Sequence, residues 1–276
     1  PWSNVGKVDN SGFDLSVNWK TQPIKDMWVD VRANFTYNKN KYVYKDEPEY
    51  PYVWKTETGK PLNRRLGYIC DGFFESQAEI DNAPSQLYGK EVLKVGDLKY
   101  RDVNGDGTIN SDDQVMISPY GSTPRIQWGT GLNITYKNWD FGIFFNGSAK
   151  RSIMINKLEP FGTAIGTSEH NLMKFIADNH YSLNDPDNFN VLYPRLGITS
   201  DQTKHNMVES SFWLRNGNFV RFKTLEFGYT FKKKYRIYFS ADNLAVWSKF
   251  KEWDPELNWD SYPLSQTFNI GAQFKF

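Results

Sequence analysis

The feature that most constrains this chain is a strict alternation of apolar and polar residues in several separate segments. In segment 27–37, Val29, Val31 and Ala33 alternate with Asp30 and Arg32. Successive side chains of a β-strand point to opposite faces, so a period of two predicts a strand with one apolar and one polar face. The pattern recurs in six further segments: 13–20, 126–136, 139–146, 225–231, 237–241 and 268–276.

A water-soluble antiparallel sheet with one wet face gives the same alternation. Two features favour strands that cross a membrane. The runs reach about 10 residues, which a tilted membrane strand needs, whereas soluble strands average about 5–6. Aromatic residues also gather at the ends of the apolar stripes, where the two aromatic girdles of a membrane barrel would fall; they are Trp19, Tyr37, Tyr136, Trp139 and Tyr229.

The connections between these segments alternate between short and long. Short turns occupy 21–26, 137–138 and 232–234, and long connections occupy roughly 39–123, 149–217 and 248–264. Short periplasmic turns opposite long extracellular loops are typical of outer-membrane barrels. The sequence therefore predicts an all-β chain in which residues 1–276 form part of one antiparallel transmembrane barrel domain.

A barrel assigns each side chain to one environment. We expect one set of residues to face lipid, and these are Phe13, Leu15, Val29, Val31, Ile134, Phe141 and Phe227. We expect the opposite set to face the lumen, and these are Asp14, Asp30, Asn133 and Asp140. Seven strands do not close a bacterial barrel, so we expect the chain to be a fragment whose missing strands lie before Pro1, since Phe276 ends a strand.

Bulk composition excludes several other classes. Thirty-three basic residues against 32 acidic ones give a net charge of +1, which offers no basic face for nucleic acid. The single Cys70 allows no internal disulfide. No segment reaches the run of about 18 apolar residues that a membrane helix needs. A mean hydropathy of −0.64 decides nothing, because a polar lumen and long loops lower the average of a barrel too.

Six motifs, in order along nearly the whole chain, resemble the C-terminal half of SusC/RagA-type TonB-dependent transporters, which import nutrients across the Gram-negative outer membrane. The strongest match is Gly96–Gly107, with the letters GDLKYRDVNGDG. The terminal Phe276 is similar to the signal that the barrel-assembly machinery reads. The other five motifs are Asn4–Leu15, Gly67–Phe74, Arg215–Lys223, Asp242–Leu244 and Trp253–Glu256.

The resemblance implies a barrel of about 22 strands around a plug. It also implies a SusD-like lipoprotein that caps the barrel, and energy supplied by TonB through an N-terminal region that these residues do not contain. The implied cargo is a glycan or an oligopeptide, and the sequence does not choose between them. The alternatives are a passive porin and a soluble, calcium-stabilised all-β module that binds or cleaves glycans.

One segment has the spacing of a calcium-binding loop. Acidic or amide side chains fall at positions 1, 3 and 5, a glycine at 6, a backbone carbonyl ligand at 7 and an acid at 12. A plain Asp-Gly or Asn-Gly turn is the competing interpretation. Because no histidine or base lies nearby, we expect a structural Ca²⁺ site and no catalysis; its residues are Asp102, Asn104, Asp106, Thr108, Asn110 and Asp113.

Two other groups of residues are weaker candidates. Asp254 and Glu256 could form a glycosidase pair, but beside Pro255 they are better interpreted as turn residues. Trp247, Trp253 and Trp259 could stack on sugar rings or simply pack the last long loop. The sequence therefore leaves the substrate-binding residues open and predicts a protein that is not an enzyme.

Overall fold

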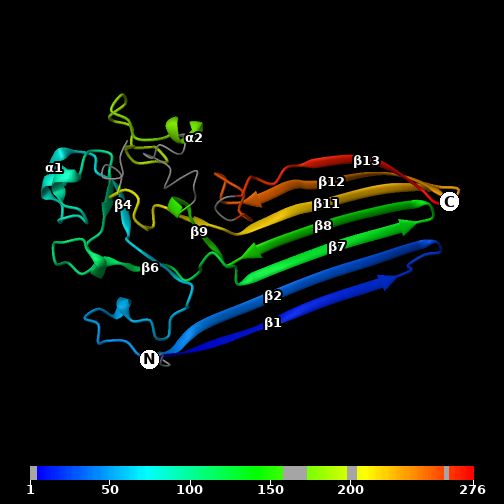
Figure 1. Ribbon diagram of the computed structural model, residues 1–276, viewed down its shortest axis with the longest axis horizontal. Helices are drawn as coiled ribbons and strands as arrows, with labels where there is room; N and C mark the ends of the chain where they lie inside the picture. Colours follow the sequence, from blue (N-terminus) through cyan, green and yellow to red (C-terminus); the bar gives the residue numbers. More distant parts are fainter. Residues whose placement is uncertain (1–4, 158–172, 198–203, 258–260) are drawn as a thin grey trace.

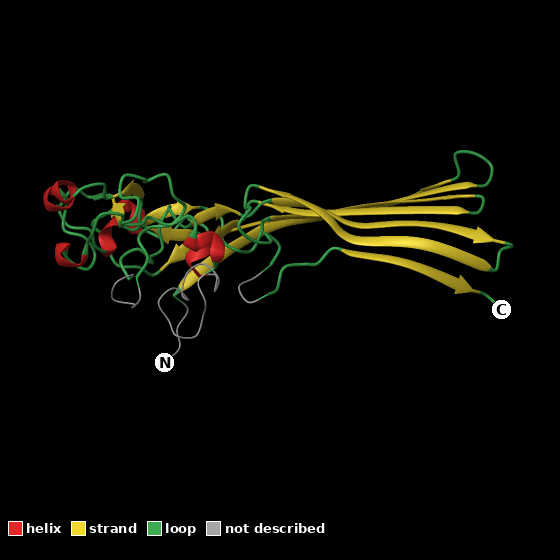
Figure 2. Ribbon diagram, turned by 90° about the horizontal axis from the view of Figure 1, so that it is seen from above, coloured by secondary structure: helices red, strands yellow, loops and turns green. Residues whose placement is uncertain are grey.

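The structure, a computed structural model, describes residues 5–157, 173–197, 204–257 and 261–276. One antiparallel sheet of seven long strands dominates it, with a smaller head at one end (Figures 1 and 2). The predicted all-β antiparallel fold is confirmed. In sheet order the strands are β1 (Gly6–Thr21), β2 (Met27–Lys45), β7 (Ile126–Tyr136), β8 (Trp139–Ala149), β11 (Phe219–Phe231), β12 (Tyr235–Ser248) and β13 (Thr267–Phe274).

The connections divide between the two ends of the sheet as the sequence predicts. Short turns join β1 to β2, β7 to β8 and β11 to β12 at one end, and the long connections gather at the head (Figure 1). Each long strand pairs with the long strand that comes next in the sequence, so the sheet is a simple meander. None of the helices in the described part of the chain is long and apolar enough to cross a membrane.

The register sorts the two faces of the sheet across all seven strands. Directly paired residues of antiparallel strands lie on the same face. One row of paired residues is apolar throughout: Trp19, Val31, Leu132, Ile143, Leu225, Ala241 and Phe268. The next row, on the opposite face, contains no large apolar residue: Lys20, Asp30, Asn133, Gly142, Glu226, Ser240 and Asn269.

The apolar face of the sheet is exposed. The side chains of Leu15, Phe227 and Ile270 are 53%, 45% and 84% exposed. An apolar surface that spans seven strands is far larger than the patches that soluble monomers leave in water, and this indicates a face that hydrocarbon covers. We call this the outer face, and the opposite one the inner face.

Aromatic side chains lie at both ends of the outer face. Near the short turns, Trp139 stacks on Phe227 at 5.1 Å between ring centroids and contacts Tyr229 at 4.5 Å. Near the head, Phe145 stacks on Phe222 at 4.6 Å. Aromatic rings with one apolar and one wet side suit a membrane–water interface, and these clusters lie where the girdles are expected.

Five strands, β1, β2, β8, β11 and β12, extend well beyond the predicted segments, and the extensions of β2 and β12 move the boundaries of predicted loops. β2 runs on to Lys45, and the first long connection therefore begins later than residue 39. Residues 38–41 are Asn-Lys-Asn-Lys, so no alternation marks them as a strand, yet they pair with residues 9–12 of β1. β12 likewise runs to Ser248, which places Trp247 opposite Val220 in the sheet and outside the last loop.

The buried core of the described residues lies in the head. Short strands form it: β3 (Arg65–Gly67) with β6 (Val115–Ser118), β4 (Cys70–Phe73) with β5 (Leu98–Tyr100), and β9 (Ser152–Met154) with β10 (Leu214–Asn216). The helices α1 (Gln77–Asn82) and α2 (Lys174–Ala177) and the 3-10 turns Val53–Lys55, Lys90–Val92, Ser111–Asp113 and Ile155–Lys157 complete it. Its centre combines residues of all three long connections, among them Leu98, Tyr100, Ile155, Tyr193, Trp213 and Phe250. The aromatic loops therefore pack on one another.

A buried polar cluster joins the first two long connections. Asp97, 1% exposed, accepts hydrogen bonds from the Arg195 guanidinium at 3.0 and 3.1 Å and from the Asn206 amide at 2.8 Å. Asn206 also accepts a bond from the Leu98 backbone at 2.9 Å. Because a buried carboxylate needs such partners, this cluster fixes how the two connections pack.

Candidate functional site

The inner face carries a charged cluster where it meets the head. Arg221 of β11 is 2% exposed and bonds to Glu256 at 2.8 Å and to Asp254 at 2.5 Å. Asn146 of β8 lies opposite Arg221 in the sheet and donates a hydrogen bond to Glu256 at 3.2 Å. These contacts tie the last long loop to the inner wall of the sheet.

The two acids of this loop are structural partners of an arginine. The Glu256 backbone N–H donates to Asp254 at 2.9 Å, which is the hydrogen bond of an Asx turn, so the interpretation of these acids as turn residues is confirmed. Their carboxylates are both engaged by one buried guanidinium. This arrangement leaves neither acid free to act as the general acid of a glycosidase.

A cleft of about 610 Å³ opens beside this cluster. Its walls combine the middle of β2 and the head ends of β7, β8 and β11 with the segment 122–124 and the last loop. Both polar and aromatic side chains line it: Asn34, Gln127, Phe144, Asn146, Ser148, Arg151, Phe219, Lys223 and Glu256. Asn34 and Asn146 both pair with Gly129, and this row shares its face with Asp30, so the cleft opens on the inner face.

A bulge shapes this part of the wall. The register of β11 shifts between Phe222 and Thr224 against both neighbouring strands, so Lys223 has no residue opposite it. On β12 the matching irregularity falls at Asn243, which has a left-handed φ of 56°. Bulges next to functional sites re-aim a side chain, and here Lys223 lines the cleft.

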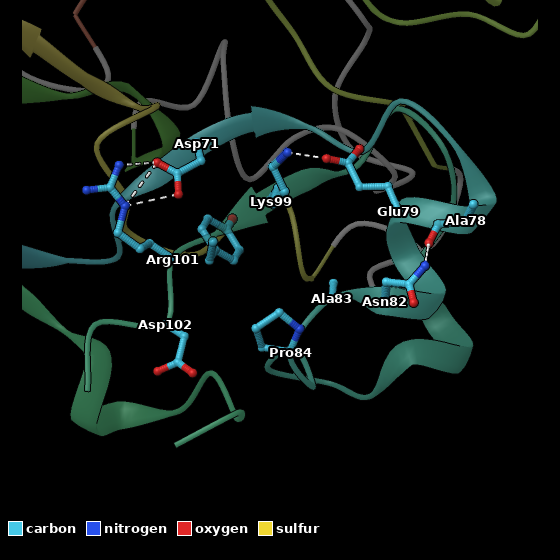
Figure 3. A pocket seen from close by; sticks show the side chains of 10 residues that line it. Asp71, Ala78, Glu79, Asn82, Ala83, Pro84, Lys99, Arg101 and Asp102 are labelled. Carbon is cyan, nitrogen blue, oxygen red and sulfur yellow. Dashed lines mark hydrogen bonds and ion pairs between the residues drawn. The ribbon is translucent and has the colours of Figure 1, made fainter. Parts of the chain in front are cut away.

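A second cleft, of about 520 Å³, lies in the head (Figure 3). Two ion pairs, Arg101–Asp71 and Lys99–Glu79, lie along it, and Asp102 borders it near Pro84. These two pairs neutralise four of the five charges that line the cleft and leave Asp102, whose carboxylate accepts from the backbone of its own loop. No cation of this cleft is left without an acidic partner, so it does not offer a site for an anion.

The predicted calcium loop folds as a tight turn of the kind that its spacing implies. Asp102 accepts from the backbone N–H groups of Gly105 and Gly107 at 2.7 Å each. Asn104 accepts from the N–H of Asp106 at 3.0 Å. Gly107, at position 6, has a left-handed φ of 82°, which a glycine adopts without strain.

The acid at position 12 has a different environment from the others. Asp113 is 0% exposed and accepts from the backbone N–H groups of Val103 at 2.8 Å and Asn110 at 2.8 Å. It therefore joins the two ends of the loop. In the described part of the chain, no group of three or more His, Cys, Asp or Glu side chains is placed to hold a metal ion.

The tryptophan candidates separate in the structure. Trp247 belongs to β12 and, paired with Val220, is 53% exposed. Trp253 packs against the core of the head. Trp259 lies outside the described residues, as does Asn4 of the first motif. The three residues therefore form no common platform that the structure describes.

Sequence reasoning did not assign a role to Arg151, Arg221 or Lys223, although the last two fall within a motif of the resemblance. The usable signal was the break in alternation at residues 221–224, where two basic residues interrupt an aromatic stripe. Arg151 gave no signal. It follows β8 and reaches the cluster only through the fold, where it bonds to the carbonyl of Pro255, 104 residues away.

The seven-stranded meander, its sorted faces and its head define a class: part of the wall of an outer-membrane β-barrel. Comparison with solved structures gives the same fold. The chain matches the RagAB peptide transporter with a TM-score of 0.66 and 21% identity, over 99% of this chain and 29% of that one. It matches the closed-closed state of the RagAB peptide importer with a TM-score of 0.65 and 23% identity, covering 99% of this chain and 30% of that one.

Sequence comparison narrows the class. The chain is 25% identical to the TonB-dependent receptor SusC of Bacteroides thetaiotaomicron over 300 residues, and 24% identical to the TonB-dependent receptor P3 of Formosa agariphila over 310 residues. These alignments cover 99% of this chain but 27% and 29% of the relatives, so the chain spans under a third of their length. No family model matches the chain. The resemblance to SusC-type TonB-dependent transporters is confirmed: the chain is SusC-like along nearly all of its length.

Proposed function

We propose that this chain forms part of the barrel wall and extracellular head of a TonB-dependent importer in the outer membrane of a Gram-negative bacterium. The observation that carries the proposal is the sorting of faces across all seven strands, apolar and exposed outside, polar inside. A soluble module would have to cover that outer face with protein. The named relatives are TonB-dependent receptors, and a receptor or transporter role fits a site without a free catalytic pair.

The cargo that we propose is a glycan or an oligopeptide. SusC-like sequence and the fold of a peptide importer support this range without choosing within it. We further propose a SusD-like lipoprotein as the partner above the head, and TonB as the energy source through a part of the transporter outside this chain. The head supports a partner at this end because the long connections form one packed body there (Figure 2).

The test uses the full-length transporter in its native membrane. We expect detergent extraction to release it with a lipoprotein in comparable amount, and deletion of its gene to abolish uptake of at least one labelled oligosaccharide or oligopeptide. Depletion of TonB should have the same effect as the deletion, whereas a passive porin would keep transporting. Unchanged uptake in both strains, or recovery of the protein in the soluble fraction without detergent, would overturn the proposal.

We also propose that the loop 102–113 binds a hard cation such as Ca²⁺. The oxygens of Asp102, Asn104 and Asp106, with the backbone carbonyl of Thr108, would supply ligands, and Asp113 would hold the loop closed. The motif spacing and the left-handed Gly107 support this. Tyr52 lies beside the loop, with its hydroxyl 3.1 Å from the Asn104 amide, and stacks on Trp54 at 4.7 Å.

That aromatic pair provides an assay. Tb³⁺ bound in the loop should luminesce when the tyrosine and tryptophan are excited, and added Ca²⁺ should displace it. Asp106→Asn keeps the side-chain shape but removes a charge, so we expect it to weaken the signal by about tenfold or more. Asp71→Asn, outside the loop, is the matched control. Luminescence that is absent, or equally weakened by both substitutions, would contradict the cation site.

A further inference from the structure

The cleft on the inner face contains buried polar atoms that the described residues leave without partners. Arg151 and Ser148 are 8% and 6% exposed, and both line the cleft. Their Nε and Oγ atoms, and Oδ1 of Asn146 in the same cleft, find no hydrogen-bond partner among the described residues. Buried polar groups of native proteins are nearly always hydrogen-bonded, so three such atoms beside one cleft mark its wall as polar, with hydrogen-bonding capacity that the described residues leave unused.

The charges of this cleft do not balance. Arg151, Lys223 and Glu256 line the cleft. Arg221 bonds to Glu256 and to Asp254, so the cluster contains three cations and two acids. Both acids are already engaged by Arg221. The Nζ of Lys223 lies 3.8 Å from Glu256, a long contact, and its side chain is 41% exposed.

Arg151 is the less compensated of the two arginines. It forms no salt bridge in the described part of the chain, and its partner through Nη1 is the neutral carbonyl of Pro255. Burial lowers the pKa of its guanidinium, and the charges of Glu256 and Asp254 act in the opposite direction. A guanidinium stays protonated at neutral pH even so, and the site therefore retains a positive charge that an anion would neutralise.

We propose that this cleft binds a carboxylate of the imported molecule, with Lys223 as the contacting cation and Arg151 as the buried charge behind it. Asn146 and Ser148 make the wall beside that carboxylate polar. The inference rests on the proposed import function and narrows its cargo to acidic molecules. The carboxylate can come from a uronic-acid oligosaccharide or from an acidic peptide, because both present it next to hydrogen-bonding groups.

The bulge of β11 supports the choice of Lys223 as the contacting group. Counted back from Phe227, the alternation would carry residue 223 to the outer face, whereas counted forward from Arg221 it falls on the inner face, and the register shift lies between the two. In the structure Lys223 keeps the face of Arg221 and lines the cleft. A lysine on the outer face would be costly in lipid, so the bulge both avoids that cost and supplies the cation.

The test compares matched probes on the complete transporter, purified with any partner that accompanies it. One pair is trigalacturonate and its methyl-esterified form. The other is N-acetyl-Ala-Glu-Ala-amide and N-acetyl-Ala-Gln-Ala-amide. In calorimetric titrations we expect the acidic member of at least one pair to bind about tenfold or more tightly than its neutral partner, which corresponds to about 1.4 kcal/mol. The pair that shows the preference identifies the source of the carboxylate.

The variant Lys223→Gln should remove most of that preference, chiefly by weakening the binding of the acidic probe. Because Lys223 is half-exposed and only weakly paired, the substitution should not impair folding, and unchanged heat-modifiable migration will verify this. Lys20→Gln is the matched control, since Lys20 lies near the short turns, far along β1 from the cleft. The control should keep the full preference.

Three results would overturn the inference: equal affinity within both pairs, a preference that survives Lys223→Gln, or no binding of any probe by a transporter that imports an uncharged nutrient. In each of these cases import itself can persist, and the proposed function then stands without the acidic cargo. The proposed function itself would be refuted by a different result: deletion of the gene would leave the uptake of every labelled nutrient unchanged.

Discussion

Placing an arginine on the outer face of β2 should destabilise the transporter far more than placing one on the inner face. Val31 lies in the row of seven apolar residues, between Trp19 and Leu132. It is the fifth residue of a strand that begins at Met27. At about 3.4 Å per residue and a tilt of about 40°, it lies about 10 Å from the short-turn end, close to the middle of an apolar band about 25 Å tall.

An arginine near the bilayer midplane costs about 2–4 kcal/mol, which corresponds to a loss of about 30- to 700-fold in the folding equilibrium. Asn34→Arg, three residues along the same strand, places the same side chain on the inner face opposite Gly129, which has no side chain to displace. We expect its effect to stay below about 1 kcal/mol. The assay is the folded fraction of the full-length transporter in lipid vesicles across a urea series, read by heat-modifiable migration. Similar losses for both variants would refute the assignment of faces.

Three further predictions concern the head. Arg221→Gln should leave Asp254 buried and unpaired and destabilise the packing of the last loop by about 3–5 kcal/mol, measured as faster hydrogen exchange in residues 249–257 with exchange in β1 unchanged. Trp213→Ala, at the centre of the head core, should cost about 3–5 kcal/mol, seen as early protease cleavage of the head with the sheet intact. Burial lowers the pKa of His205, so the unfolded head binds a proton more readily than the folded head does. The stability of the head should therefore fall as the pH drops below about 6.5. The variant His205→Gln should abolish this pH dependence, and His180→Gln should preserve it.

The sheet was predictable from the sequence because its information is local. A strand such as 27–37 shows both faces within a few residues, and a short turn sets the register with the next strand. The prediction was incomplete where the chain lacks this contrast, as at residues 38–41, where hydrogen bonds to β1 decide the structure and the side chains do not. It was also incomplete at Trp247, because an aromatic residue beside a loop looks the same as one at a strand end.

The head and the cleft were not predictable in the same way. Asp97 meets Arg195 across 98 residues and Arg151 meets Pro255 across 104, and no periodicity links positions so far apart. The calcium-type motif predicted the turn at Gly107, since its glycine and Asx residues act locally. It did not predict that Asp113 would bond to the backbone at both ends of the loop.

Arg221 connects the sheet to the last long loop beside the cleft. Its backbone belongs to β11, whose register is set by twelve residue pairings with β12 and ten with β8, while its guanidinium holds two acids of the last loop. Contacts with the barrel wall therefore help to fix the position of that loop, in addition to the packing of the head. Lys223 lies two residues further along the same strand, on the bulge, so the proposed carboxylate site and the loop that borders it are fixed to one rigid element. A site held this way keeps its geometry even if a partner moves above the head, which is what binding at the mouth of a transporter requires.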